Sequence, residues 1–460
     1  MNHDDLNHWS KRAADWASDY HRNLRNRPVR APLLPGAIAR QLPATAPDAP
    51  EPMEAIFADF ERIVPPGMTH WQHPRFFAYF PANAAPASML AEQLANAMAC
   101  QGMLWQTSPA ATEIEQVMVG WLRGALGLPA GFVGTIHDSA TTATLSAILT
   151  MREQALGFQS NISGMHGKVL RIYASAQTHS SVDKAVRVAG IGQDNLVKVA
   201  TDDSFSMRPD ALDAAIRADL ALGMLPAGVV LCAGGTSIGA FDRIGDCIAV
   251  AKAHGLPVHV DAAWAGSAMI CPEFRALWAG IEGADSIVFN PHKWLGVQFD
   301  CAIQFLRDPG PQVKTLGLRP SYLETAGREE IVNFNEWTVP LGRRFRALKL
   351  WFTLRAYGLD GLRARIRNHV QWAQASCTAL AALPGVKIIT QPILSLYTFA
   401  LADDAQTERL LHRINDDGRI YLTQTLHEGR YVIRVQVGQF DCTQADVMMI
   451  AQVVAELIGD

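Results

Sequence analysis

Residues 284–294 read ADSIVFNPHKW, a short apolar run that is followed by a lysine, Lys293. Upstream, residues 256–266 read LPVHVDAAWAG, a second apolar run that ends in the carboxylate of Asp261. Short runs of this kind predict buried strands, and helical patterns alternate with them through the middle of the chain. Such alternation is typical of a parallel sheet covered by helices on both faces. Because open sheets of this kind bind ligands beyond the carboxyl ends of their strands, we expect Lys293 and Asp261 at the ligand-binding edge.

The rest of the chain extends this pattern in both directions. Residues 170–175 (LRIYAS) and 227–233 (AGVVLCA) predict two more strands, and residues 244–255 (IGDCIAVAKAHG) predict a helix. Apolar and aromatic residues at three- and four-residue spacing predict an amphipathic helix from Leu6 to about Leu24. The expected fold class is therefore α/β. We expect an N-terminal helical segment over residues 1–80, a large sheet domain over 81–360 and a small C-terminal α+β domain over 361–460.

The composition limits the class of function. The 460 residues are 49% hydrophobic and 18% charged, so the chain can bury a large core. A formal net charge of −4 gives no field that would attract nucleic acid or an anionic membrane, so the expected partner is a small molecule. No secretory signal or long apolar stretch is evident, and the seven scattered cysteines form no Cys-x-x-Cys pair. We therefore expect a cytoplasmic protein without disulfides or a bound metal.

Lys293 and Asp261 together indicate a particular chemistry. Burial lowers the pKa of a lysine, and the resulting free amine can condense with an aldehyde. A carboxylate near that amine could hold the pyridine nitrogen of a pyridoxal cofactor protonated, so that the ring accepts electrons from a broken substrate bond. Each residue alone has a simpler interpretation, a surface lysine and an aspartate that caps a helix. Their placement after two neighbouring strands favours the cofactor interpretation.

Two further segments fit a phosphorylated, planar cofactor. Residues 134–144 (GTIHDSATTAT) place hydroxyl-rich residues at the start of a predicted helix, where backbone N–H groups can bind a phosphate. His179 follows the strand over residues 170–175, so its ring could stack on a flat cofactor. Taken alone, the first segment is an ordinary capped helix and His179 is an ordinary hydrogen-bonded histidine.

At these residues the sequence resembles the group II pyridoxal-phosphate decarboxylases, and in particular the aromatic L-amino acid decarboxylases. The resemblance runs from about residue 5 to the C-terminus. It includes the segments GMTHWQHPRFFAYFP (67–81), SPAATEIE (108–115), THSSVDKA (178–185), VHVDAAWAGSAMICPEFR (258–275), SIVFNPHKWLGVQFDC (286–301) and VPLGRRFRALKLWF (339–352). It implies a pyridoxal-phosphate fold of type I, similar to aspartate aminotransferase, with a mixed sheet in the large domain. It also implies a homodimer with active sites at the subunit interface.

The resemblance implies a role for each site residue. Lys293 would carry pyridoxal 5′-phosphate (PLP) as a Schiff base, Asp261 would pair with the pyridine nitrogen and His179 would stack over the ring. The other cofactor-binding residues would be Ser139, Ala140, Thr141, Ala263, Asn290 and His292. Tyr322, in the segment from Leu318 to Asn333 that matches the family's mobile catalytic loop, would protonate the carbon that loses carbon dioxide.

The implied substrate pocket has two parts. Trp71, Tyr79 and Phe80 would line it, although plain core packing is the alternative interpretation of such aromatic residues. Gln101 and Met103 would reach in from the other subunit, and both differ from the isoleucine and phenylalanine that are usual there. Gly342 lies where related plant enzymes with glycine accept indoles, which favours substrates of the size of tryptophan.

The expected function is therefore decarboxylation of an aromatic L-amino acid, such as tryptophan, 5-hydroxytryptophan, phenylalanine, tyrosine or dihydroxyphenylalanine, to the arylalkylamine. An aromatic aldehyde synthase and a decarboxylase of another L-amino acid are the alternatives. Aldehyde synthases replace the loop tyrosine or the stacking histidine, so Tyr322 and His179 favour simple decarboxylation. A metal hydrolase is less favoured, because the histidines His70, His73, His254 and His259 have no metal-binding spacing. A catalytically silent scaffold would not require the set of lysine, aspartate and histidine.

Overall fold

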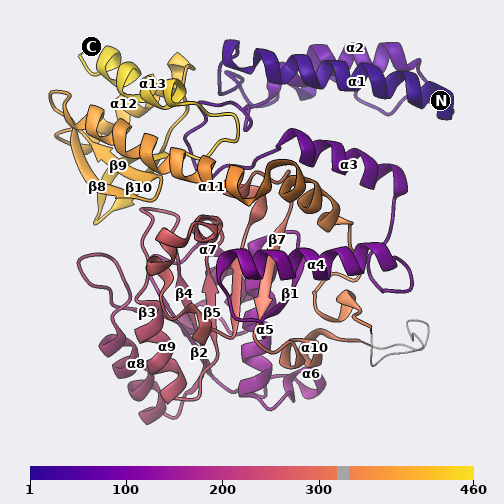
Figure 1. The fold of residues 1–460 in the computed structure, drawn as a ribbon. Helices are drawn as coiled ribbons and strands as arrows, with labels where there is room; N and C mark the ends of the chain where they lie inside the picture. The colour runs from indigo at the N-terminus through magenta and orange to yellow at the C-terminus, as the bar shows by residue number, and fades with distance from the viewer. Residues whose placement is uncertain (319–330, 460) are drawn as a thin grey trace. The chain divides into compact units, whose positions relative to one another are not determined.

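The computed structural model describes residues 1–318 and 331–459, and the contacts among them define two compact units (Figure 1). The central unit comprises Ala82–Gln371 and the short stretch Pro392–Leu396. The terminal unit comprises Met1–Pro81, Trp372–Gln391 and the chain from Tyr397 onwards. The predicted division into segments 1–80, 81–360 and 361–460 stays a prediction.

A seven-stranded mixed sheet forms the centre of the central unit, with strand order β1-β7-β6-β5-β4-β2-β3. β7 is antiparallel to both of its neighbours, whereas β6, β5, β4, β2 and β3 are mutually parallel. The strands are β1 (Val133–His137), β2 (Leu170–Ser175), β3 (Leu196–Val199), β4 (Leu225–Cys232), β5 (Val258–Asp261), β6 (Ser286–Phe289) and β7 (Ala302–Leu306). The strands β4 to β7 are almost wholly buried, as expected for a sheet covered on both faces.

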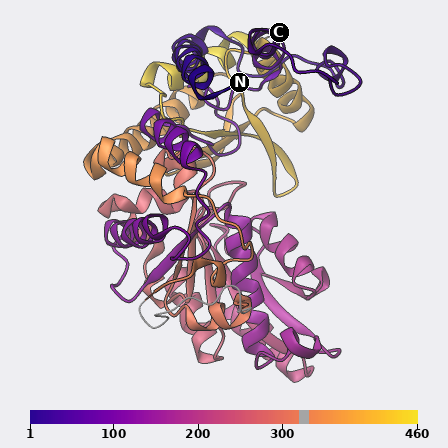
Figure 2. The ribbon, with the colours of Figure 1, turned by 90° about the vertical axis from the view of Figure 1, so that its right-hand side faces the viewer.

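Helices cover both faces of this sheet, as the view in Figure 2 shows. α4 packs against β1 and β7, and α5 lies along the strands from β1 to β4. The helices of the central unit are α3 (Pro86–Met98), α4 (Pro109–Leu126), α5 (Ala140–Ala155), α6 (Ser160–Ser163), α7 (Ser180–Val188), α8 (Pro209–Ala221), α9 (Ile244–Ala253), α10 (Gly310–Leu316) and the first part of α11 (Arg346–Ala381). This architecture confirms the predicted α/β class with a mixed sheet.

The terminal unit has its own sheet and its own core. Its four strands have the order β10-β11-β9-β8 and pack with α12 and α13 around buried residues such as Tyr397, Phe399 and Ile450. The elements are α1 (His3–Asn23), α2 (Met53–Ile63), β8 (Lys387–Ile393), β9 (Leu396–Ala400), α12 (Asp404–Asp417), β10 (Thr423–His427), β11 (Arg430–Gln436) and α13 (Gln444–Leu457). The predicted N-terminal helix and small C-terminal α+β fold are therefore present.

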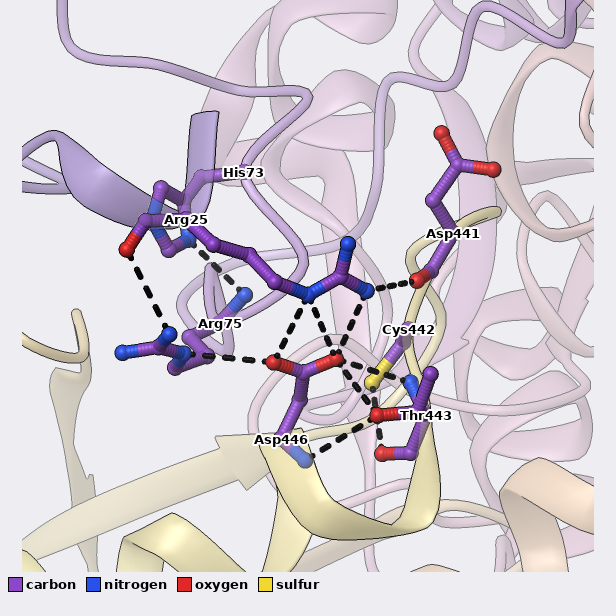
Figure 3. A network of polar contacts seen from close by, with 7 residues as sticks. All are labelled: Arg25, His73, Arg75, Asp441, Cys442, Thr443 and Asp446. Carbon is purple, nitrogen blue, oxygen red and sulfur yellow. Dashed lines mark hydrogen bonds and ion pairs between the residues drawn. The ribbon is translucent and has the colours of Figure 1, made fainter. Parts of the chain in front are cut away.

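A buried carboxylate joins the two ends of the chain in the terminal unit (Figure 3). Asp446, in the first turn of α13, is 5% exposed and accepts hydrogen bonds from Arg25 Nη2 at 2.9 Å and Arg75 Nε at 3.2 Å. It also forms a capping box with Thr443, whose Oγ1 donates to Asp446 Oδ2 at 2.7 Å. Burial raises the pKa of Asp446, but the hydrogen bonds from Arg25 and Thr443 outweigh burial and the net pKa is lowered.

Among the described residues, no helix combines the length and the apolar character that crossing a membrane requires.

Candidate active site

Four strands of the central sheet deliver polar residues to one edge. Asp261 is the last residue of β5, and Lys293 lies four residues after the end of β6. His179 caps α7 after β2, and Ser139 caps α5 after β1. Because β7 is antiparallel to both β1 and β6, β1 points in the same direction as the parallel strands. All four side chains therefore start from the carboxyl edge, where the sequence predicted a ligand site.

Lys293 lies in a single π-helical turn, Pro291–Leu295, which ends at Gly296 with φ +94°. A side chain at such a φ would be strained, so glycine permits the turn to end here. The backbone N–H of Asn290 donates to Ala263 O at 2.9 Å and ties this turn to the loop after β5. Trp294 is completely buried and stacks on Trp264 with 5.2 Å between ring centroids. Its neighbours therefore fix the backbone of Lys293 firmly.

Asp261 and His179 supply the carboxylate and the imidazole of the site. Asp261 is 7% exposed, and its Oδ1 accepts a hydrogen bond from Ala263 N at 3.0 Å. Burial lowers the pKa of His179, as does the positive charge of Lys293, against an opposing effect of Asp261. His179 Nδ1 accepts from Ser181 N at 3.1 Å, so the ring is neutral with its proton on Nε2. The three side chains lie close enough to affect one another electrostatically.

The start of α5 offers donors for a phosphate. Ser139 Oγ accepts from Thr142 N at 3.2 Å, while the first backbone N–H groups of a helix have no partners within the helix. Asn290 Oδ1 is buried and has no hydrogen-bond partner among the described residues. His292 Nδ1 accepts from Cys301 N at 2.9 Å, which leaves its proton on Nε2. Burial and the neighbouring Lys293 lower the pKa of His292 to about 3.

These residues fit PLP by their chemistry. A lysine, a buried carboxylate and a neutral imidazole come from the carboxyl edge of the sheet, together with a helix start and a buried amide oxygen that has no partner among the described residues. The amine would bind the aldehyde, the carboxylate would meet the pyridine nitrogen and the helix start would bind the phosphate. No group of three or more His, Cys, Asp or Glu side chains in the described part of the chain could hold a metal ion.

A hydrogen-bond network of buried amides and histidines supports the site from inside the sheet, and the sequence did not predict it. Gln304 on β7 accepts a hydrogen bond from His137 Nε2 at 2.8 Å and donates to Ser286 Oγ at 2.9 Å. Ser286 Oγ in turn lies 2.9 Å from Nδ1 of His259, two residues before Asp261. Burial lowers the pKa of both His137 and His259 to about 4, so both rings are neutral. This hydrogen-bond network fixes β1, β5, β6 and β7 relative to one another.

The predicted substrate residues fall into both units. In the central unit, Gln101 Oε1 accepts from Arg343 N at 2.6 Å, and a Cβ on Gly342 would lie 3.2 Å from Gln101 Nε2. Two residues after Gln101, the carbonyl oxygen of Met103 accepts a hydrogen bond from Asn335 N at 3.1 Å.

The aromatic residues of the predicted pocket belong to the terminal unit. The rings of Trp71 and Tyr79 stack with centroids 5.8 Å apart, and Arg434 lies 4.6 Å from the ring centroid of Phe80. Tyr322 lies outside the described residues. A shared substrate pocket therefore stays a prediction.

Comparison with known proteins agrees with the geometry. Residues 35–402 match the pyridoxal-dependent decarboxylase conserved domain. The chain is 39% identical to aromatic-L-amino-acid decarboxylase of Mus musculus, with 97% of this chain and 96% of that protein covered. It is 36% identical to tryptophan decarboxylase 2 of Oryza sativa subsp. japonica, with 95% and 91% covered.

Solved structures give the same result. The crystal structure of Oryza sativa TDC with PLP and tryptamine is 32% identical with a TM-score of 0.96, and the match covers 100% of this chain and 98% of that one. Rhodiola rosea 4-hydroxyphenylacetaldehyde synthase is 33% identical with a TM-score of 0.93, and the match covers 99% and 98%. The predicted cofactor and enzyme class are confirmed. The chain belongs to the pyridoxal-dependent decarboxylase family of PLP-dependent carboxy-lyases.

Proposed function

We propose that this protein decarboxylates aromatic L-amino acids to arylalkylamines and carbon dioxide. The observation that carries the proposal is the convergence of Lys293, Asp261 and His179 at the carboxyl edge of one sheet. The relatives named aromatic-L-amino-acid decarboxylase, tryptophan decarboxylase and L-tyrosine/L-DOPA decarboxylase support an aromatic substrate.

The side chains of the site have separate tasks in this proposal. PLP, when bound, supplies an electron-accepting ring for the bond between Cα and the carboxylate. Lys293 would hold the cofactor through its side-chain amine, and the substrate amine would take its place. Asp261 would keep the pyridine nitrogen protonated, and His179, whose pKa is lowered by burial, would pack against the cofactor as a neutral ring. Tyr322 delivers a proton to Cα after carbon dioxide leaves.

The phosphate and the substrate are bound by the other predicted residues. Ser139, Ala140, Thr141, Asn290 and His292 would hold the phosphate, with Ala263 against the ring. The aromatic side chain would meet Trp71, Tyr79, Phe80, Gln101, Met103 and Gly342. We further propose a homodimer with its active sites at the subunit interface, and a cytoplasmic location.

An aromatic aldehyde synthase is the second candidate, because relatives named phenylacetaldehyde synthase and 4-hydroxyphenylacetaldehyde synthase match most of the chain. Such an activity would consume oxygen and release ammonia and hydrogen peroxide with the aldehyde. The presence of Tyr322 and His179 favours the amine product.

A product screen separates these candidates. The purified protein with PLP is incubated separately with tryptophan, 5-hydroxytryptophan, tyrosine, dihydroxyphenylalanine, phenylalanine and histidine. Amine, aldehyde, carbon dioxide and peroxide are measured. We expect amine and carbon dioxide in equal amounts from an aromatic acid, without peroxide. Equal amounts of aldehyde and peroxide would establish the second candidate, and histamine alone would refute an aromatic preference.

A further inference from the structure

One asparagine satisfies two consecutive carbonyl groups of the turn that carries Lys293. Within this turn, Val297 N donates to Pro291 O at 3.1 Å. The next two carbonyls are bound by Asn83: its backbone N–H donates to His292 O at 3.0 Å, and its side-chain Nδ2 donates to Lys293 O at 2.6 Å. Asn83 is 1% exposed, so water does not readily replace these donors.

The segment that carries Asn83 is itself held in place. Ala85 N donates to Gly296 O at 3.0 Å, just beyond the lysine turn. Three residues later, Ser88 Oγ accepts from Gln298 N at 2.7 Å. Hydrogen bonds at several positions therefore hold this segment alongside the turn, and among them those of Asn83 contact Lys293 itself.

The peptide group after Lys293 is fixed from two sides. Asn83 binds its carbonyl oxygen, and the next residue, Trp294, is held by the stack with Trp264 and by a 2.9 Å hydrogen bond from its Nε1 to His369 Nδ1. A rotation of this peptide would turn the Cα–Cβ bond of Lys293 and displace its amine. Loss of the Asn83 side chain removes one of the two restraints.

We infer that Asn83 is a positioning residue for Lys293, which sets where the amine meets the cofactor aldehyde. The inference rests on the proposed role of Lys293. It assigns the effect to the donor group of Asn83, because the partner is a carbonyl oxygen that can only accept.

Substitutions at Asn83 that replace or remove its donor test this inference. Asn83→Asp keeps the shape but places a carboxylate oxygen against Lys293 O, whereas Asn83→Ala removes the donor together with the rest of the amide. Asn83→Ser keeps a hydroxyl that can donate. We therefore expect cofactor retention in the order wild type, Asn83→Ser, Asn83→Ala, Asn83→Asp, although size alone would place Asn83→Asp nearest to wild type.

The assay uses the holoenzyme and measures the rate of PLP release together with the visible absorbance of the bound cofactor. An unsatisfied buried carbonyl predicts about tenfold faster release for Asn83→Ala, and the added repulsion predicts a further loss for Asn83→Asp. The KM for amino acid should change less than kcat, because the substrate is not contacted. Ser88→Ala is the matched control, since it removes a buried hydrogen bond of the same segment without touching the lysine turn; release should stay within about threefold of wild type.

The inference and the proposed function fail in different ways. Holoenzyme prepared from Lys293→Arg should lack the visible band; a band of wild-type strength would overturn the role of Lys293. If that band is absent as expected, release from Asn83→Ala at the rate of Ser88→Ala would overturn the role of Asn83. Tighter retention by Asn83→Asp than by Asn83→Ser would do the same, and this comparison remains decisive if Asn83→Ala does not fold.

Discussion

Replacing Asp446 by alanine should destabilise the protein far more than the loss of a surface carboxylate. The substitution leaves Arg25 and Arg75 without their shared partner, and Arg75 is only 16% exposed. Removing one partner of a buried ion pair costs about 3–5 kcal/mol, and we take about 3 kcal/mol because Arg25 is 41% exposed. Loss of the capping box at the start of α13 adds about 1 kcal/mol. The expected total is about 4 kcal/mol.

Urea unfolding at fixed protein and PLP concentrations measures this loss. The matched control is Glu456→Ala, which removes an exposed partner of Arg419 at the other end of the same helix. Exposed ion pairs contribute about 0–1 kcal/mol, so the control should unfold close to wild type. Hydrogen exchange should locate the effect of Asp446→Ala in the chain around Arg25 and Arg75.

Equal shifts for the two variants would refute this reasoning, because it depends on the burial of Asp446 rather than on its charge. A shift of Asp446→Ala without faster exchange around Arg25 would refute the link between the two ends of the chain.

Three further predictions concern the sheet, the pH dependence and the reaction. In Gly134→Ala the new Cβ would lie 2.3 Å from the backbone oxygen of Gln304, so stability should fall by about 3 kcal/mol or more in a thermal or urea melt. In the control Gly131→Ala the new Cβ meets no atom within 4 Å, so stability should change by less than about 1 kcal/mol. Equal melts for the two variants would contradict the close contact between the strands. Three buried histidines have pKa values lowered to about 4, so folding favours their neutral forms. The free energy of unfolding should therefore fall as the pH drops from about 6.5 to about 4, by about 1.4 kcal/mol per pH unit for each histidine. These histidines are His73, His137 and His259; a urea midpoint that does not change between pH 7 and pH 5 would argue against their neutral burial. Tyr322→Phe should divert the product from amine to aldehyde with ammonia and hydrogen peroxide, with oxygen as the oxidant, and a peroxide assay that stays at the wild-type level would count against the role of this tyrosine.

The sheet and its ligand-binding edge could be predicted from the sequence because their signals are local. The strands β5 and β6 are short apolar runs, and Asp261 at the end of β5 and Lys293 just beyond β6 can be recognised from position alone. The mixed character of the sheet has no such local signal. It depends on β7, an apolar run whose direction is set by its neighbours and not by its own residues.

The supports of the site could not be predicted in the same way. Asn83 lies 210 residues before Lys293, and Gln304 lies 167 residues after His137. Neither residue belongs to a pattern of spacing, because each bond depends on how distant segments pack. A lone asparagine in a segment rich in alanine and proline was the available signal, and it has no meaning until its partner carbonyl is known.

Gly342 illustrates a prediction that acquires a second explanation. By resemblance, a glycine here favours substrates of indole size. In the structure, its missing Cβ also leaves room for the amide of Gln101, 3.2 Å from the place where that Cβ would lie. A Cβ at this position would need the Gln101 amide to shift by a few tenths of an ångström, so a neighbour in this chain gives a reason for the glycine that does not depend on the substrate.

Reduction of the holoenzyme with borohydride, followed by mass mapping of its peptides, tests whether Lys293 carries the cofactor. We expect one stable adduct with the mass of the reduced cofactor, on the lysine that follows the Asn-Pro-His sequence. An adduct on another lysine, or a protein that takes up no PLP, would contradict it.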